Sequence, residues 1–169
     1  MASVFFKPKP VTSTAPDWYE KLLAGVAAIL WIVVVVALAK GQADWPRVPR
    51  GVWLHLATIM VALTLTPYML LRPRGTPIHR SLGKVWVTAM TATAAISLFV
   101  RYSNPGHFSF IHILSVVVLI LAPRVWLTAR SHNIAAHRAT VRGLVTGALI
   151  VAGYFTLLQT RLLGHWLFG

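Results

Sequence analysis

The sequence of 169 residues contains no cysteine and only three acidic residues, Asp17, Glu20 and Asp44. The absence of cysteine excludes disulfides, thiolate metal sites, iron–sulfur clusters and thioether-linked haem. Because no acidic residue interrupts a long apolar run, the sequence has no carboxylate pair for a proton relay, a carboxylate-bridged metal pair or general acid–base catalysis. A glycine-rich phosphate loop is also missing, so nucleotide binding has no support.

Apolar and basic residues are in excess. Hydrophobic residues make up 57% of the chain, and the mean hydropathy is +0.69, whereas soluble domains contain roughly 45–50% apolar residues. Sixteen Lys and Arg give a formal net charge of +13, and they lie between the apolar runs instead of along one polar face. This distribution argues against a nucleic-acid partner and predicts a lipid bilayer with anionic lipids as the partner.

Five apolar stretches are each about long enough to cross a bilayer core of ~30 Å. They cover residues 19–39, 52–71, 83–100, 108–128 and 142–161. They predict an all-α integral membrane bundle of about five transmembrane helices. The chain divides into an N-terminal segment, residues 1–18, and a single transmembrane domain, residues 19–169. We expect the Val-rich first helix to lie at the periphery of a four-helix core, residues 52–161.

Local signals mark the helix ends and the orientation. Asp17 and Glu20 have the spacing of a capping box, and Pro77 and Asn133 occupy favoured positions where the third and fifth helices begin. Most tryptophans, including Trp86, fall near the ends of apolar stretches and are expected at the level of the lipid headgroups. Most Lys and Arg lie in the N-terminal segment and in the second and fourth loops, which predicts a cytoplasmic N-terminus and a C-terminus outside.

A repeat relates residues 55–84 to residues 112–143. In each copy a His opens a helix, a Pro follows after 12 or 11 residues, and a second His follows the first after 24 or 25 residues. The first histidines are His55 and His112, and the second are His79 and His137. The pattern predicts a helical hairpin that occurs twice, as helices two and three and as helices four and five.

The topology pairs these histidines by depth. His55 and His112 belong near the outer ends of helices two and four, and His79 and His137 near the inner ends of helices three and five. About 24 Å of helix separates the two pairs. Two imidazoles on facing helices are able to occupy both axial positions of a haem iron, which favours electron transfer over oxygen chemistry. The sequence thus predicts two b-type haems.

Two arginines follow these histidines directly and are candidate partners of the haem propionates, Arg80 and Arg138. Other interpretations remain for each site. A His near a helix end also serves as a packing contact, and an Arg there also serves as an anchor on the cytoplasmic side. Imidazoles also bind copper or zinc, although two ligands under-coordinate a bare ion. His107, His132 and His165 have no matched partner and are expected to be solvated.

A family resemblance follows from these motifs. His55, the His-Arg-x-x-Gly motif at residues 79–83, His112 and the Ala-His-Arg motif at residues 136–138 resemble the pattern of a family of small bacterial integral-membrane proteins. Four histidines on consecutive helices are also similar to the transmembrane two-haem b-type cytochromes that move electrons from ascorbate. That resemblance implies haem between helices two and four and between helices three and five. That class has six helices, and this chain has no clear ascorbate-binding segment.

Together these patterns predict a transmembrane electron carrier with two haems in the bacterial cytoplasmic membrane. Its electron donor would be a quinol or a partner redox protein. The alternative is a structural accessory subunit, poor in cofactors, of a larger respiratory or photosynthetic membrane complex. A channel or transporter for small molecules has only the bundle itself in its favour.

Overall fold

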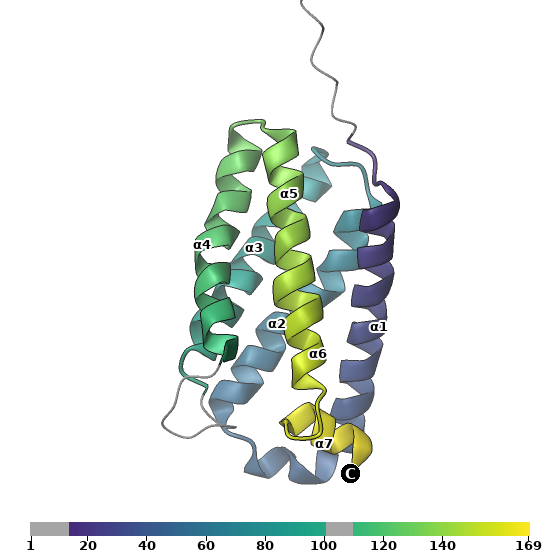
Figure 1. Ribbon diagram of the computed structural model, residues 1–169, viewed down its shortest axis with the longest axis vertical. Coiled ribbons are helices and arrows are strands. Elements are labelled where there is room, and N and C mark those ends of the chain that lie inside the picture. Colours follow the sequence, from purple (N-terminus) through teal and green to yellow (C-terminus); the bar gives the residue numbers. More distant parts are fainter. Residues whose placement is uncertain (1–13, 101–109) are drawn as a thin grey trace, which may run out of the picture.

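The computed structural model describes residues 14–100 and 110–169, and these residues form helices and no strands (Figure 1). The prediction of an all-α chain is confirmed. The long helices are α1 (Trp18–Lys40), α2 (Arg50–Leu71), α3 (Pro77–Ser97), α4 (Phe110–Arg130) and α5 (Ile134–Leu144). The shorter elements are η1 (Gln42–Arg47), η2 (Val145–Val151), α6 (Ala152–Thr156) and α7 (Leu162–Phe168). Most of the predicted N-terminal segment, the start of the fourth stretch and His107 lie outside the described residues.

Four helices of the described chain are long and apolar enough to cross a membrane, which indicates a multi-pass membrane protein. They are α1, α2, most of α4 and the continuous rod Ile134–Thr156, which joins α5, η2 and α6. α3 has 21 residues but is more polar, because Arg80 and Lys84 lie in its first turns and threonines follow. By composition α3 therefore does not stand out as a span.

The predicted helix starts are confirmed by their caps. The Asp17 carboxylate accepts the Glu20 N–H at 3.1 Å, and the Glu20 carboxylate accepts the Asp17 N–H at 3.1 Å. α3 begins at Pro77 as predicted, and Asn133 caps α5 by accepting the Ala136 N–H at 3.0 Å. These side chains satisfy N–H groups that have no partner within the helix.

The apolar stretches that start at 83 and 142 are shorter than the helices that contain them, because both helices begin earlier, at Pro77 and Ile134, with charged residues in their first turns. One consequence concerns Trp86, which was expected at a helix end. It lies in the third turn of α3, is 3% exposed and donates from its indole N–H to the Thr66 hydroxyl on α2 at 2.9 Å. Trp86 is thus a buried contact between helices and not an interfacial anchor.

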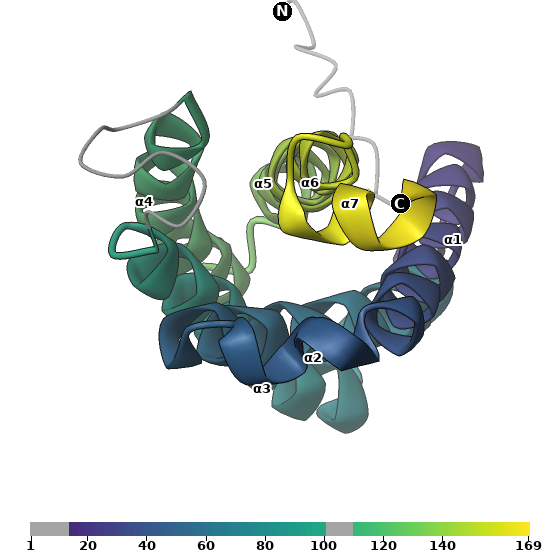
Figure 2. The ribbon, with the colours of Figure 1, turned by 90° about the horizontal axis from the view of Figure 1, so that it is seen from below.

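The helices α1 to α4 lie side by side in chain order and form a curved wall, and the rod of α5, η2 and α6 lies on its concave side (Figure 2). The rod packs against α4 and α1, so it closes the ring. α1 buries Ala24, Ala27 and Ala37 on one side, and on the other side Ile29 and Ile32 are exposed, as expected for a surface in contact with lipid.

The C-terminal helix α7 lies across the end of the bundle where α2 begins (Figures 1 and 2). The last predicted stretch ends at Thr156 and not at 161, and the chain then turns back to pack α7 against α1. Trp166 packs on Gly41 and donates to the Asp44 carboxylate at 3.1 Å. The Lys40 ammonium donates to the Leu167 carbonyl. These contacts fix α7 at this end.

Candidate functional site

A cavity of about 700 Å³ lies at the end of the bundle where α3 and α5 begin. His79 of α3 and His137 of α5 both line it, and we call it the His79–His137 cavity. Their ring centroids are 6.3 Å apart, and the ring planes make an angle of 71°. The structure thus brings together the two histidines that the repeat pairs at this depth.

The imidazole of His137 has a fixed hydrogen-bond partner. Its Nδ1 lies 3.2 Å from the Val125 carbonyl oxygen of α4. Because a carbonyl oxygen only accepts, Nδ1 donates, and Nε2 is left as the nitrogen with a free lone pair. A hydrogen bond of this kind from the second nitrogen to a backbone carbonyl is typical of metal-binding histidines. On the other side of the cavity, Nδ1 of His79 is buried and has no hydrogen-bond partner among the described residues.

These dimensions fit a flat cofactor that carries a metal between two imidazoles. With metal–nitrogen bonds of about 2 Å and a ring centre about 1.2 Å beyond each nitrogen, two axial imidazoles have centroids roughly 6 Å apart. The angle between the ring planes is compatible, since His79 and His137 would hold such a cofactor from its two faces whatever the angle between their rings. The volume also lies within the range of about 300–1,000 Å³ for ligand and cofactor sites. The residues present therefore fit haem b.

The other two histidines line a second cavity nearer the opposite end, the His55–His112 cavity. The Nδ1 of His55 lies 3.2 Å from the Thr93 carbonyl oxygen of α3, which repeats the arrangement of His137 and leaves Nε2 as the acceptor. This cavity has a volume of about 230 Å³, below the usual range for cofactor sites. The pairing by depth agrees with the lining of both cavities, but the two cavities differ in size.

A bare metal ion has less support. Within residues 14–100 and 110–169, no three or more His, Asp or Glu side chains gather as a group that could hold one. Zinc sites need three or four protein ligands. Haem needs only the axial pair, because the macrocycle supplies the other four nitrogens.

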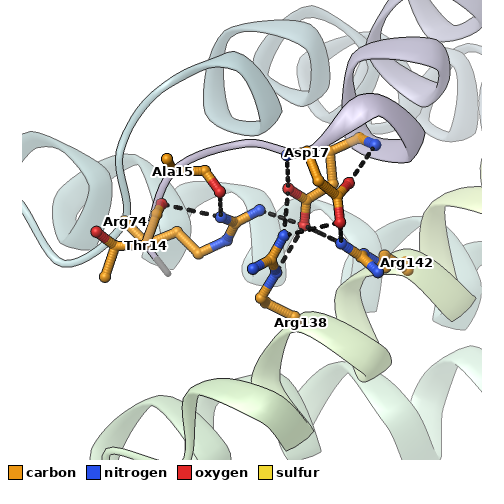
Figure 3. Close-up of polar contacts among 7 residues, drawn as sticks. Thr14, Ala15, Asp17, Arg74, Arg138 and Arg142 are labelled. Carbon is orange, nitrogen blue, oxygen red and sulfur yellow. Dashed lines mark hydrogen bonds and ion pairs between the residues drawn. The ribbon is translucent and has the colours of Figure 1, made fainter. Parts of the chain in front are cut away.

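Figure 3 shows an ionic cluster at the start of α1. We call it the carboxylate cluster, and it consists of Asp17, Glu20, Arg74, Arg138 and Arg142. Three of its members, Glu20, Arg74 and Arg138, also line the His79–His137 cavity. Arg138 lies 3.0 Å from both carboxylates, and Nε of Arg142 donates to Glu20 at 3.1 Å. Arg74 also pairs with Glu20, and Arg142 with Asp17. The cluster ties α1 to α5 and to the turn between α2 and α3.

Glu20 is 1% exposed, which requires such partners because an unpaired buried charge is strongly unfavourable. Asp17 lies at the edge of the cluster, ahead of the membrane-spanning part of α1. The backbone N–H of Glu20, assisted by the guanidinium groups of Arg142 and Arg138, holds the pKa of the Asp17 carboxyl below its ordinary value. Both carboxylates of the cluster therefore have direct cationic partners.

The arginines that the sequence assigned to propionates lie in different surroundings. Arg80 is exposed at the rim of the cavity, and its Nε donates to the Gly75 carbonyl at 3.0 Å. Arg138 also lines the cavity, but its guanidinium binds the carboxylates of Asp17 and Glu20. Sequence reasoning missed this role. One signal in the sequence pointed to it. Acidic residues are rare in this arginine-rich chain, and two of the three, Asp17 and Glu20, lie within four positions of each other.

Comparisons of the chain with protein-family models, curated proteins and solved structures gave no match. The class is therefore defined by the fold and the site alone. Four apolar helices and paired histidines on facing helices describe a multi-pass helical membrane protein with a candidate cofactor cavity.

Proposed function

We propose that this protein is a transmembrane electron carrier that binds haem b between His79 and His137. The observation that carries the proposal is the 6.3 Å separation of the two imidazole centroids across a cavity of about 700 Å³. Haem b with two axial histidines supplies a one-electron carrier without an open position for oxygen.

The residues around the cavity would hold the two histidines in place. The Val125 carbonyl fixes the ring orientation of His137 through Nδ1. His79 lies in the first turn of α3, where the Thr76 hydroxyl accepts its backbone N–H at 3.1 Å. Trp86 and Val125 form part of the apolar wall, which would exclude water from the iron and so tune its potential.

The proposal extends to a second haem between His55 and His112, which rests on the sequence repeat and on the shared cavity. The smaller volume of this cavity means that it must widen to accept a haem. In this arrangement α3 also crosses the membrane, which brings the number of transmembrane helices to five. The pairs α2–α3 and α4–α5 are then the duplicated hairpin. Electrons would cross a bacterial cytoplasmic membrane between the two sites. The donor would be a quinol or a partner redox protein.

The test is a dithionite-reduced minus oxidised absorption spectrum with haem quantified per chain. We expect sharp low-spin bands in the wild type, loss of one haem in His79→Ala, and loss of a different haem in His55→Ala. His165→Ala is the matched control, because His165 is exposed on α7, and it should keep the wild-type spectrum. A featureless spectrum from protein produced with ample haem would refute the carrier and leave the accessory-subunit interpretation.

A further inference from the structure

The rim of the His79–His137 cavity carries an excess of positive charge. Five of the residues that line the cavity have a fixed positive charge, Arg74, Arg80, Lys84, Arg130 and Arg138. Only one has a negative charge, Glu20. The floor and walls are apolar around the histidines. The cavity is therefore amphipathic, with an apolar interior and a cationic rim.

Two of these five cations already have carboxylate partners within the chain. Arg74 and Arg138 bind Glu20, and Arg138 also binds Asp17. The third acidic residue, Asp44, lies at the opposite end of the bundle, where it pairs with Arg47. Since the sequence has only three acidic residues, no acidic side chain remains for Arg80, Lys84 and Arg130.

These three cations lie on two walls of the cavity mouth. Arg80 and Lys84 are four residues apart on α3, so they share one face of that helix. Arg130 is the last residue of α4, on the facing wall. All three are exposed, which places them at the mouth and not on the floor. Two walls of cations around an apolar interior suit a ligand that has a flat apolar body and acidic groups at one edge.

We infer that Arg80, Lys84 and Arg130 bind the two propionate carboxylates of haem b at this site. This inference rests on the proposed function. It assigns the carboxylates to cations that have no acidic partner, because ion pairs with charged donors are among the stronger hydrogen-bonded contacts. Arg138 instead holds α5, and with it His137, against the start of α1.

The test compares haem with haem dimethyl ester, which has the same macrocycle and iron but no carboxylates. Apoprotein in a lipid-free, non-ionic detergent is titrated with each compound, and the Kd is taken from the absorbance change. We expect the wild type to bind haem about tenfold or more tightly than the ester. In the double variant Lys84→Gln/Arg130→Gln, which keeps Arg80, the affinity for haem should fall most of the way to that for the ester, whereas the affinity for the ester should not change.

The matched control is Arg124→Gln, which removes a cation that is exposed on α4 and does not line the cavity. It should keep the wild-type difference between the two compounds. Equal wild-type affinities for haem and ester would overturn this inference alone and would leave the rim cations as partners of acidic lipid headgroups. The same conclusion follows if the double variant loses affinity for both compounds equally. If neither compound binds, the proposed function and this inference both fail.

Discussion

Glu20 is the most buried acidic side chain of the described residues, and three guanidinium groups surround it. Glu20→Gln would leave Arg74, Arg138 and Arg142 with a single carboxylate. We expect a loss of stability of about 3–5 kcal/mol, the cost of removing one partner from a buried ion pair. Thermal unfolding in detergent, followed by circular dichroism, measures it.

The control for Glu20 is Arg47→Gln, which breaks an exposed pair with Asp44 at the other end of the bundle and keeps the contact of Asp44 with Trp166. A pair of this kind contributes at most about 1 kcal/mol. Similar shifts of the unfolding temperature for both variants would show that the carboxylate cluster does not stabilise the bundle.

Asp17 gives the cluster a dependence on pH. Its pKa is lowered in the folded protein, first by the Glu20 N–H and then by Arg142 and Arg138. A carboxyl with a lowered folded-state pKa stabilises the fold above its unfolded-state value, about pH 4, and this contribution is lost as the pH falls through the lower folded-state value. We expect Asp17→Asn to reduce the fall of the unfolding temperature below about pH 4. Identical pH profiles for the variant and the wild type would contradict this role.

At the residue scale, local and repeated signals were readable from the sequence, and contacts between distant residues were not. The caps at Asp17 and Asn133 depend on neighbours three residues away, so spacing alone revealed them. The pairing of His79 with His137 followed from the repeat. In contrast, Glu20 and Arg138 are 118 residues apart, and no periodicity connects them. Their pairing depends on how the ring of helices closes.

At the element scale, α7 depends on a close approach at Gly41. A Cβ atom on Gly41 would lie 2.1 Å from the Trp166 ring, whereas a Cβ on Gly25 would meet nothing within 4 Å. Since Gly41 has a φ of −83°, the penalty for alanine is steric and not conformational. We expect Gly41→Ala to displace α7 and Gly25→Ala to leave it in place.

The absence of native cysteine allows a direct measurement of this displacement. Leu163 of α7 is 8% exposed, so a Leu163→Cys variant should react slowly with a maleimide. The reaction should be several-fold faster when Gly41→Ala is added, and unchanged when Gly25→Ala is added. Equal labelling rates in all three backgrounds would show that the contact of Trp166 with Gly41 does not hold α7.

The elements themselves differed in how far the sequence revealed them. Long apolar runs identified α1, α2 and α4 because their composition alone sets them apart. α3 and α5 begin before their apolar stretches, with polar turns, and their starts were revealed by Pro77 and Asn133 and not by hydropathy. α7 has seven residues, too few for a periodic pattern, and its stability depends on contacts with α1. η2 is a stretch of π-helix, a local change of pitch that leaves no signal in composition.

At the scale of the whole molecule, the distribution of positive charge predicts the orientation, with the N-terminus in the cytoplasm. Ala43, before α2, and Ser131, after α4, are both exposed at opposite ends of the bundle. We expect Ala43→Cys to react with an impermeant maleimide in intact cells, and Ser131→Cys to react only after the cells are opened. The reverse pattern would invert the orientation.

The same approach tests whether α3 crosses the membrane. Pro73 precedes α3 and Phe99 follows it, and both are exposed. If α3 crosses the membrane in addition to the other four helices, Phe99→Cys should react in intact cells like Ala43→Cys. Pro73→Cys should react only after the cells are opened, like Ser131→Cys. Labelling of both positions from the same side would reduce the number of spans to four.

The carboxylate cluster also has a consequence for the order in which the protein is made. Glu20 enters the membrane with the first helix, while Arg138 is translated 118 residues later. At a synthesis rate of roughly 5–20 residues per second, this interval lasts about 6–24 s. Arg74 is translated earlier and is the first cation available to Glu20. The nascent chain thus has one cluster cation for the two carboxylates of Asp17 and Glu20 until its final long helix arrives, and closure of the ring becomes a late step of biogenesis.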